Sequence, residues 1–257
     1  MLATLSTDLE LLALQAEGAR DPAGRLAGQY GVTIACAPGA HALWIGSEVP
    51  DAAVTELAAA LAATAPALDP TAPPAALDRC RQILEAGHAV ALHAGPSYVF
   101  PDDVPPAVDV RIERSDRPQP AALRGGNPGN WQPAEWDDLV DGRLGPWTMV
   151  LDGARVVSLC HTPSPLTSRR AECGVWTEPA FRGRGYAAAT AVAWAAIVRP
   201  VSGTLFYSTD ADNRSSQRVA ARLGLRPIGW TWRLHAPDPR AGQLHPLSAA
   251  ASRRPSR

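Results

Sequence analysis

Two glycines in an arginine-rich loop are the residues whose types and spacing point most directly to chemistry. Gly183 and Gly185 alternate with arginines, between an apolar run at 173–177 and a long alanine-rich run that begins at Tyr186. This pattern predicts a strand, a loop and a helix. Glycines at the mouth of a helix let backbone N–H groups turn inward, and the helix N-terminus adds partial positive charge. We therefore expect a phosphate-bearing ligand at this loop.

The same loop allows three other interpretations. Gly183-x-Gly185-x-x-Ala188 fits the dinucleotide fingerprint, with Asp210 near the place of an acidic ribose ligand. However, about five residues separate the predicted strand from the glycines, and the chain beyond has room for only about one more βα unit. A Walker loop is excluded because no Lys-Ser/Thr pair follows the glycines. A plain turn between strand and helix remains open on the loop alone.

The second half of the chain carries a longer pattern. An Arg-x-x-Gly-x-Ala loop follows a strand, an Asn-x-x-Ser sequence comes some 25 residues later, and a Gly-Leu pair closes the second helix; these residues are Arg182, Gly185, Ala187, Asn213, Ser216, Gly224 and Leu225. The pattern resembles that of the Gcn5-related N-acetyltransferase (GNAT) superfamily, over roughly residues 108–235. The resemblance implies acyl transfer from acetyl-coenzyme A, as co-substrate, to an amine.

The resemblance also implies how the co-substrate binds. The strand at 173–177 would splay away from the strand at 204–209, and the pantetheine arm would hydrogen-bond the exposed edge as an added strand does. The loop amides would hold the pyrophosphate, with the two loop arginines adding charge. The residues implied in cofactor binding are Val175, Thr177, Arg182, Gly183, Arg184, Gly185, Tyr186, Ala187, Asn213 and Ser216.

Some of these residues have a second interpretation. Asn213 serves equally as a helix cap. Arg214, Arg218 and Arg222 form an i, i+4 stripe on the predicted second helix, which is either a solvated face or a grip on the 3′-phosphate of coenzyme A.

Three residues are candidates for the catalytic steps. Glu172, at the start of the predicted strand, is the expected general base, and His161 is the alternative; an exposed acid and a structural histidine are the corresponding non-catalytic interpretations. Many relatives place a tyrosine, which protonates the leaving thiolate, where this chain has Ala220. Tyr207 or a water molecule would take over that role. Cys173 is not expected to act as a nucleophile, because nothing beside it lowers its pKa.

The expected fold class is α/β (α+β): the GNAT fold, a mixed, mostly antiparallel sheet with splayed central strands and flanking helices, plus a smaller N-terminal α/β domain. We expect an N-terminal unit at 1–105, with a substrate-side or regulatory role, and the acetyltransferase domain at 106–236. The Pro-, Ser-, Ala- and Arg-rich segment 237–257 is expected to be a disordered tail.

Local patterns predict individual strands. Residues 88–93 and 97–100 are expected to be two strands, and alternation predicts a further strand at 108–113. Asp152-Gly153 between two apolar runs is a strong hairpin signal.

Composition limits the other classes of function. The formal net charge is -1, and all 24 basic residues are arginines, so no surplus of basic residues indicates a nucleic-acid partner. The four cysteines show neither a metal-ligand spacing nor a disulfide framework, and no metal is expected. No segment reads as a signal peptide or a membrane span, so we expect a cytoplasmic protein with no membrane partner. We further expect a bacterial protein that is a monomer or a homodimer.

The sequence therefore predicts an acetyl-coenzyme A-dependent N-acetyltransferase that acts by direct attack on a primary amine, expected to belong to a small molecule. Acetylation of a peptide or protein amine is the alternative within enzymes. A non-catalytic acyl-coenzyme A-binding or regulatory module is the alternative outside them, favoured by the missing tyrosine at Ala220.

Overall fold

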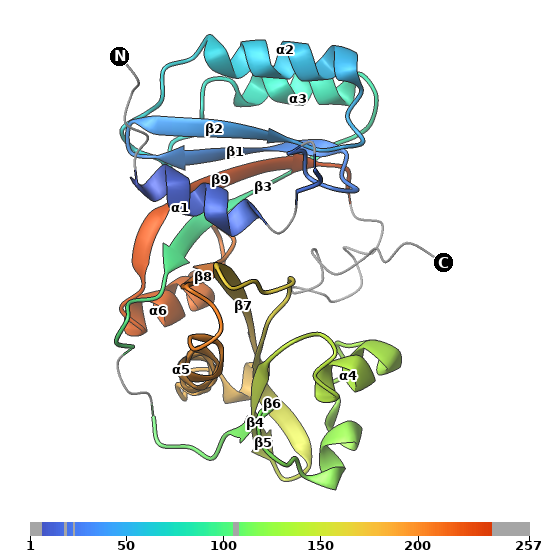
Figure 1. Cartoon of the computed structure of the whole chain (residues 1–257), viewed down its shortest axis with the longest axis vertical. Coiled ribbons are helices and arrows are strands. Elements are labelled where there is room, and N and C mark those ends of the chain that lie inside the picture. Colours follow the sequence, from blue (N-terminus) through green and yellow to red (C-terminus); the bar gives the residue numbers. More distant parts are fainter. Residues whose placement is uncertain (1–6, 18–19, 23, 105–107, 238–257) are drawn as a thin grey trace. The chain divides into compact units, whose positions relative to one another are not determined.

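The structure, a computed structural model, describes residues 7–17, 20–22, 24–104 and 108–237 (Figure 1). Contacts divide these residues into two compact units. The first contains the residues up to Tyr98 together with Ser208–Arg214 and the segment from Pro227; the second contains Val99–Tyr207 and Ser215–Arg226. The predicted boundary between 105 and 106 remains a prediction, and nearly all of the predicted tail lies outside the described residues.

The first unit is built on four strands. These are β1 (Gly31–Ala37), β2 (Ala40–Ile45), β3 (Ala91–Val99) and β9 (Arg226–His235), in the order β2-β1-β9-β3. β1 is antiparallel to both β2 and β9, and every residue of β1 is buried. The prediction of two strands at 88–93 and 97–100 was wrong: one strand, β3, runs through Pro96.

Helices cover the strands of the first unit (Figure 1). α2 (Asp51–Ala62) packs on α3 (Leu77–Glu85), and both contact the sheet; α1 (Thr7–Ala16) also packs on β1 and β2. The apolar core between α2, α3 and the sheet consists of Val32, Ile34, Cys36, Val49, Leu57, Leu61, Ala76, Leu77, Cys80, Leu84, Trp232 and Leu234. Burial of these side chains is the main stabilising contribution in this unit.

The second unit contains the strands that matter for the site. Their order is β8 (Thr204–Ser208), β7 (Arg170–Thr177), β6 (Arg155–His161), β5 (Trp147–Asp152) and β4 (Glu113–Arg114). β7 and β8 are parallel and the other pairs are antiparallel. The predicted hairpin at Asp152-Gly153 is confirmed, since β5 and β6 pair across it.

Two predictions at strand ends were wrong. In place of the strand expected at 108–113, the structure has the two-residue strand β4. Alternation of residue types does not show whether a segment has a neighbouring strand to pair with. β7 begins at Arg170, three residues before the predicted start, so Glu172 lies inside the strand.

The sheet of the second unit has two differently covered faces. Side chains alternate along each strand, and the register places Thr148, Cys160 and Val175 on one face and Trp147, His161 and Gly174 on the other. α5 (Tyr186–Val198) packs on β5, β6 and β7 at the first face, which we call the α5 face. The 3-10 helix η2 (Ala121–Gly126) and α4 (Pro133–Val140) cover the second, the α4 face (Figure 1).

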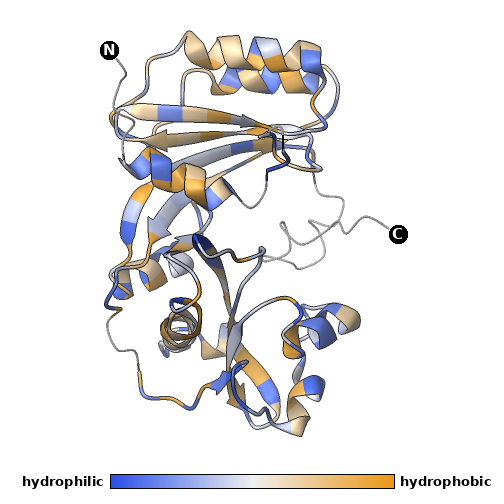
Figure 2. Cartoon of the chain, in the orientation of Figure 1, coloured by the Kyte–Doolittle hydropathy of each residue, from blue (hydrophilic) through white to orange (hydrophobic). Residues whose placement is uncertain are grey.

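α5 is hydrophobic along its length (Figure 2). Its small buried residues Ala188, Ala189, Ala191 and Ala195 allow the helix to approach the strands closely, and Trp194 fills the remaining space. The opposite face holds a larger-residue cluster of Leu123, Trp136, Leu139, Val140, Trp147, Met149, Val156 and Leu159. The remaining elements are η3 (Pro179–Phe181) and α6 (Arg214–Arg222). The predicted fold class, a mixed and mostly antiparallel sheet with flanking helices, is confirmed.

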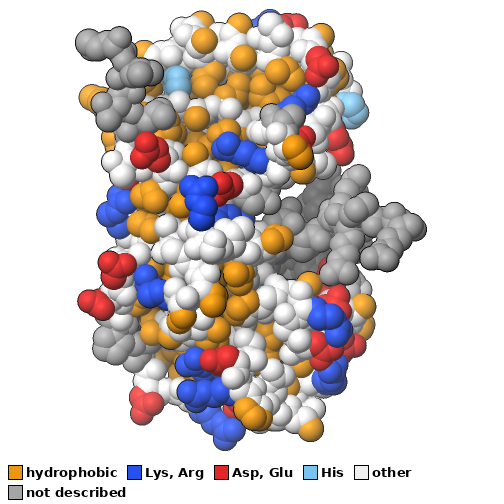
Figure 3. Space-filling view, in the orientation of Figure 1, with side chains coloured by type: hydrophobic (Ala, Val, Ile, Leu, Met, Phe, Trp, Pro, Cys, Tyr) orange, Lys and Arg blue, Asp and Glu red, His pale blue; other side chains and the backbone are white. Residues whose placement is uncertain are grey.

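The surface in view carries acidic and basic side chains intermixed (Figure 3). At α4 they form ion pairs: Arg124 with Asp137 and Asp141, and Arg143 with Asp138 and Asp141. Among the described residues, no helix is long and apolar enough to cross a membrane, and no group of His, Cys, Asp and Glu side chains is arranged to hold a metal ion.

Candidate active site

β7 pairs with a different neighbouring strand in each half. Arg170–Cys173 pair with Thr204–Tyr207 of β8, in parallel register. Gly174–Thr177 pair with β6, and the described register with β8 does not extend to them. The edge of β7 that lies away from β6 is thus unpaired from Gly174 to Thr177, which leaves backbone groups available for an added extended chain.

The backbone of Val175 and Thr177 points toward this unpaired edge. On the other side, the Glu178 N–H donates to the Val157 carbonyl of β6 at 2.9 Å. Residues next to one another in an antiparallel strand direct their N–H and C=O groups alternately to the two sides. Thr177 and Val175 lie one and three residues before Glu178, so their N–H and C=O groups face away from β6.

The loop between β7 and α5 has the backbone shape that the glycine pattern predicts. Gly183 and Gly185 have φ values of 81° and 84°, in the left-handed region that side chains other than glycine rarely adopt. α5 begins at Tyr186 without a side-chain cap. The first-turn N–H groups of Tyr186, Ala187 and Ala188 have no acceptor within the helix, so they can serve an anion.

The loop arginines are held by local contacts. Nε of Arg182 donates to the Thr177 carbonyl at 3.3 Å, which ties the loop to the end of β7. The Arg184 guanidinium lies over the Phe181 ring at 4.7 Å, and this ring stacks on Tyr186. Both arginines are exposed, so their charge is available beside the loop.

Gly185 is also a point of close packing. A Cβ at this position would lie 2.9 Å from Cγ1 of Val108 and 3.2 Å from Nη1 of Arg222. Arg222, in the last turn of α6, therefore reaches the glycine loop. The sequence pattern predicts only that Arg222 shares a helix face with Arg214 and Arg218, because spacing along one helix cannot show which loop lies opposite its last turn.

Asn213 and Ser216 lie at the beginning of α6. Asn213 directly precedes the helix, and its N–H donates to the Asp210 carbonyl at 3.1 Å. Ser216 follows in the first turn, and its carbonyl accepts a hydrogen bond from the Tyr207 hydroxyl at 3.4 Å. Asn213 is thus in the position of a cap, and its role toward a ligand remains a prediction.

Glu172 and Tyr207 lie on opposite faces of the sheet. Glu172 shares the α4 face with Gly174 and is partly exposed, whereas Tyr207 pairs with Cys173 and is buried on the α5 face. Their strands are adjacent and separate just beyond these residues. A base on one side and an acid on the other would therefore flank the point where β7 and β8 part. Ala220 is fully buried in α6.

His161 ends β6 on the α4 face, directly opposite Trp147 on β5 and Gly174 on β7. It is 3% exposed, and neither ring nitrogen has a hydrogen-bond partner. Trp131 meets the imidazole edge-on, with ring centroids 5.0 Å apart. Burial lowers the pKa of His161 to about 4, so the ring is neutral at pH 7 and poorly suited to hold a proton.

The thiols near the site are inert by their surroundings. Cys160 and Cys173 are buried on the α5 face. Burial, together with the neighbouring Cys173 thiol, raises the pKa of Cys160 well above its usual range. A buried thiol of this kind is a poor nucleophile at neutral pH.

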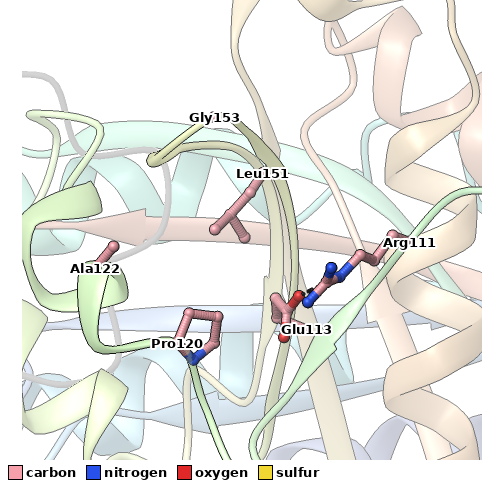
Figure 4. A pocket seen from close by; sticks show the side chains of 6 residues that line it. All are labelled: Arg111, Glu113, Pro120, Ala122, Leu151 and Gly153. Atoms are coloured by element: carbon pink, nitrogen blue, oxygen red, sulfur yellow. Dashed lines mark hydrogen bonds and ion pairs between the residues drawn. The ribbon is translucent and has the colours of Figure 1, made fainter.

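A small hollow of about 280 Å³ lies in the second unit away from these residues. Figure 4 shows its lining: Arg111, Glu113, Pro120, Ala122, Leu151 and Gly153. Its two charged groups, Arg111 and Glu113, already pair with each other at 2.8 Å. The hollow offers little polar capacity for a ligand and is not part of the candidate site.

Comparison with known proteins identifies this unit. Residues 118–226 match the family model of the acetyltransferase (GNAT) domain. The chain contains a GNAT acetyltransferase domain. The matched residues include β7, the glycine loop, α5 and α6, so the predicted family resemblance is confirmed. Acyl transfer is the chemistry that this family assignment supports.

Several solved structures are similar to the chain. A putative GNAT acetyltransferase from Novosphingobium aromaticivorans is 21% identical and covers 87% of this chain and 93% of its own, with a TM-score of 0.48. A GNAT-family acetyltransferase from Colwellia psychrerythraea is 12% identical, covers 76% of each chain and has a TM-score of 0.46. No curated protein sequence gave a significant match.

Proposed function

We propose that the protein transfers an acetyl group from acetyl-coenzyme A to the primary amine of a small molecule. The observation that carries this proposal is the unpaired edge of β7 at Gly174–Thr177, followed after residues 178–182 by two left-handed glycines and a helix N-terminus without a side-chain cap. A pantetheine chain needs an unpaired strand edge, and a pyrophosphate needs converging N–H groups. This GNAT domain offers both between Gly174 and Ala188.

Binding of the co-substrate divides among these groups. The N–H and C=O of Val175 and Thr177 would bind the pantetheine arm, and the amides of Gly183 to Ala187 would bind the pyrophosphate. Arg182, Arg184 and Arg222 add positive charge at the loop. Because backbone groups make most of these contacts, substitution of a single side chain would change the affinity for the co-substrate little. The two glycines are the exception, since their backbone conformation depends on residue type.

The chemical step follows from the two faces of the sheet. Glu172 would accept a proton from the ammonium, directly or through water, and the free amine would attack the thioester carbonyl. A C–N bond forms as the C–S bond breaks, and the thiolate takes a proton from Tyr207 or from water. A backbone N–H at the unpaired edge would stabilise the oxyanion. We assign the base to Glu172 and not His161, because His161 is enclosed and its pKa is lowered to about 4.

The test is release of the coenzyme A thiol from acetyl-coenzyme A in the presence of a panel of primary amines. We expect turnover with at least one small amine, and a Glu172→Gln variant should lose about 10²–10⁴-fold in kcat with unchanged affinity for the thioester. Exposed Glu85 at the end of α3 offers a matched control, since Glu85→Gln makes the same change on an element that carries no candidate site residue.

Each result has a distinct meaning. Binding of acetyl-coenzyme A without turnover of any amine would leave the non-catalytic acyl-coenzyme A-binding module, which the missing tyrosine at Ala220 favours. Turnover of peptides in preference to free amines would support acetylation of a peptide or protein amine. Full activity of the Glu172→Gln variant at saturating amine would remove Glu172 from the base role.

A further inference from the structure

Arg170 is a buried guanidinium at the start of β7. Its residue is 1% exposed, and it is among the largest fully buried side chains. Nη2 lies 3.4 Å from the Ser164 hydroxyl and 3.5 Å from the Pro165 carbonyl, both at the long limit of a hydrogen bond, and Nε has no partner. Within the described ranges, no ion pair joins Arg170 to a carboxylate.

A cation in such surroundings calls for an explanation. Arginine stays charged at every physiological pH, and removing its charge from water without a counter-ion is costly. Two long contacts to a hydroxyl and a carbonyl do not compensate for that cost. Buried arginines in proteins are therefore normally paired, and an anion from outside the chain would complete this one.

Arg170 is placed beside the proposed base. Arg170, Glu172 and Gly174 are alternate residues of β7, so their side chains emerge from the same, α4, face. Neighbours on one face of a strand are about 7 Å apart. A small molecule that presents its amine to Glu172 can reach Arg170 with a second group attached a few bonds away.

On the other side of Glu172, beside Gly174, buried N–H groups also have no hydrogen-bond acceptor. Trp147 is fully buried opposite His161, and Trp131 contacts the imidazole; the indole N–H of each tryptophan and both nitrogens of His161 have no hydrogen-bond partner. An indole N–H can only donate, and a neutral imidazole donates once. Donors thus outnumber acceptors on both sides of Glu172, which favours a ligand rich in acceptor oxygens.

We propose that the acceptor is an amino acid-type molecule, a primary amine that also carries a carboxylate, and that Arg170 binds this carboxylate while Glu172 faces the amine. The assignment rests on the proposed acetyltransferase function. It names Arg170 as a residue that determines specificity. The guanidinium fork suits the two oxygens of a carboxylate, which explains an arginine at this position.

The experiment compares acceptors in matched pairs: standard amino acids, their methyl esters, and alkylamines without an acidic group. Release of the coenzyme A thiol gives kcat and KM for each. The wild-type protein is expected to prefer the free acids. Arg170→Gln should lower kcat/KM for the acids about 10- to 100-fold, mainly through KM, and change it little for the esters, since one charge-assisted contact is lost.

Two further measurements separate recognition from folding. Arg169→Gln removes the same charge from the adjacent, exposed position and should leave the preference intact. Simple carboxylic acids without an amine should compete with the amino acid in the wild-type protein, which needs no variant at all. Arg170→Lys retains a positive charge without the fork and should retain part of the preference for acids over esters.

The outcomes that overturn the assignment are distinct from those that overturn the function. Turnover of amines with no preference for the free acids, or an equal loss on acids and esters in Arg170→Gln, would make Arg170 a structural support of the 164–170 turn. Absence of turnover with every amine would overturn the proposed function, and this assignment with it.

Discussion

The two faces of the sheet in the second unit treat their polar groups differently. On the α5 face, Thr148 donates to the Thr190 carbonyl at 2.7 Å, the Ser158 and Thr177 hydroxyls bond each other at 2.8 Å, and Trp194 donates to the Thr162 hydroxyl at 3.0 Å. On the α4 face, ring nitrogens of His161, Trp131 and Trp147 have no partner.

This difference in hydrogen bonding distinguishes the face that stabilises the fold from the face that carries the candidate site. Buried polar groups are normally hydrogen-bonded, so the three hydrogen bonds on the α5 face are expected to stabilise the fold. A face with several buried, unpaired donors beside a partly exposed carboxylate is arranged for something that the chain does not itself supply. In the proposed function, the helix N-terminus on the α5 face would position the co-substrate and the α4 face would receive the amine.

The largest effect is expected at the end of the α5 face, in Gly185→Asp. The new side chain would meet Val108 at 2.9 Å in a left-handed backbone conformation, and its negative charge would oppose the pyrophosphate. Affinity for acetyl-coenzyme A should fall by about 100-fold or more, since an attraction becomes a repulsion. Calorimetric titration measures it.

Gly142 supplies the matched control for this change. It also has a positive φ, 73°, and a Cβ there meets nothing within 4 Å. Gly142→Asp therefore introduces the same charge and backbone strain at the end of α4 and should leave the affinity unchanged. If Gly185→Asp binds acetyl-coenzyme A as the wild-type protein does, the loop does not hold the pyrophosphate.

The next effect is the pH dependence of stability that His161 creates on the α4 face. Its pKa is lowered from 6.5 to about 4, so the unfolded chain binds its proton more readily between these values. The stabilisation is complete above pH 6.5 and is lost as the pH falls toward 4, by about 3 kcal/mol in total. His161→Phe should remove this loss.

Denaturant unfolding at pH 7 and at pH 4 measures this difference. The exposed His88, whose ring lies tilted against that of Tyr30, gives the control, because His88→Phe changes an imidazole that already contacts water. Equal losses of stability in the wild-type protein and in His161→Phe would show that the His161 imidazole is accessible to protons in the folded state.

The smallest effect is expected from a single paired group on the α5 face. Thr148→Val removes the hydrogen bond to Thr190 of α5 and should cost about 1 kcal/mol of unfolding free energy without changing the preference among acceptors. Thr190→Val, in which only hydrogen bonds to carbonyls of its own helix are lost, should cost less. A change in the preference among amine acceptors in Thr148→Val would contradict the view that the α5 face has no part in recognising the acceptor.

Local patterns in the sequence predicted the strand, loop and helix around the glycines, because each depends on neighbouring residues. The left-handed conformations of Gly183 and Gly185 and the alternation along β7 follow from residue type and spacing. The resemblance to the GNAT family supplied the splayed strands, which no local pattern contains.

Contacts between residues far apart in the chain could not be predicted from the sequence. Arg170 precedes the predicted strand, and nothing beside it in the chain indicates that its guanidinium contacts Ser164 and Pro165 in the folded protein. The spacing of Arg222 left a solvated helix face and a grip on the 3′-phosphate of coenzyme A both open, and it could not predict the approach of Arg222 to Gly185. The one available signal was parity: Arg170, Glu172 and Gly174 alternate, so a cation and an acid share one face.

The alanines of α5 set a distance as well as filling a core. Ala188, Ala189, Ala191 and Ala195 are the contact surface between the helix and the strands, so their size fixes the height of the helix above the sheet. Larger residues there would lift the whole helix and carry its first turn with it. In the proposed function, the size of these alanines would therefore also set the distance between the groups that bind the diphosphate of the thioester and the groups that face its reactive carbonyl.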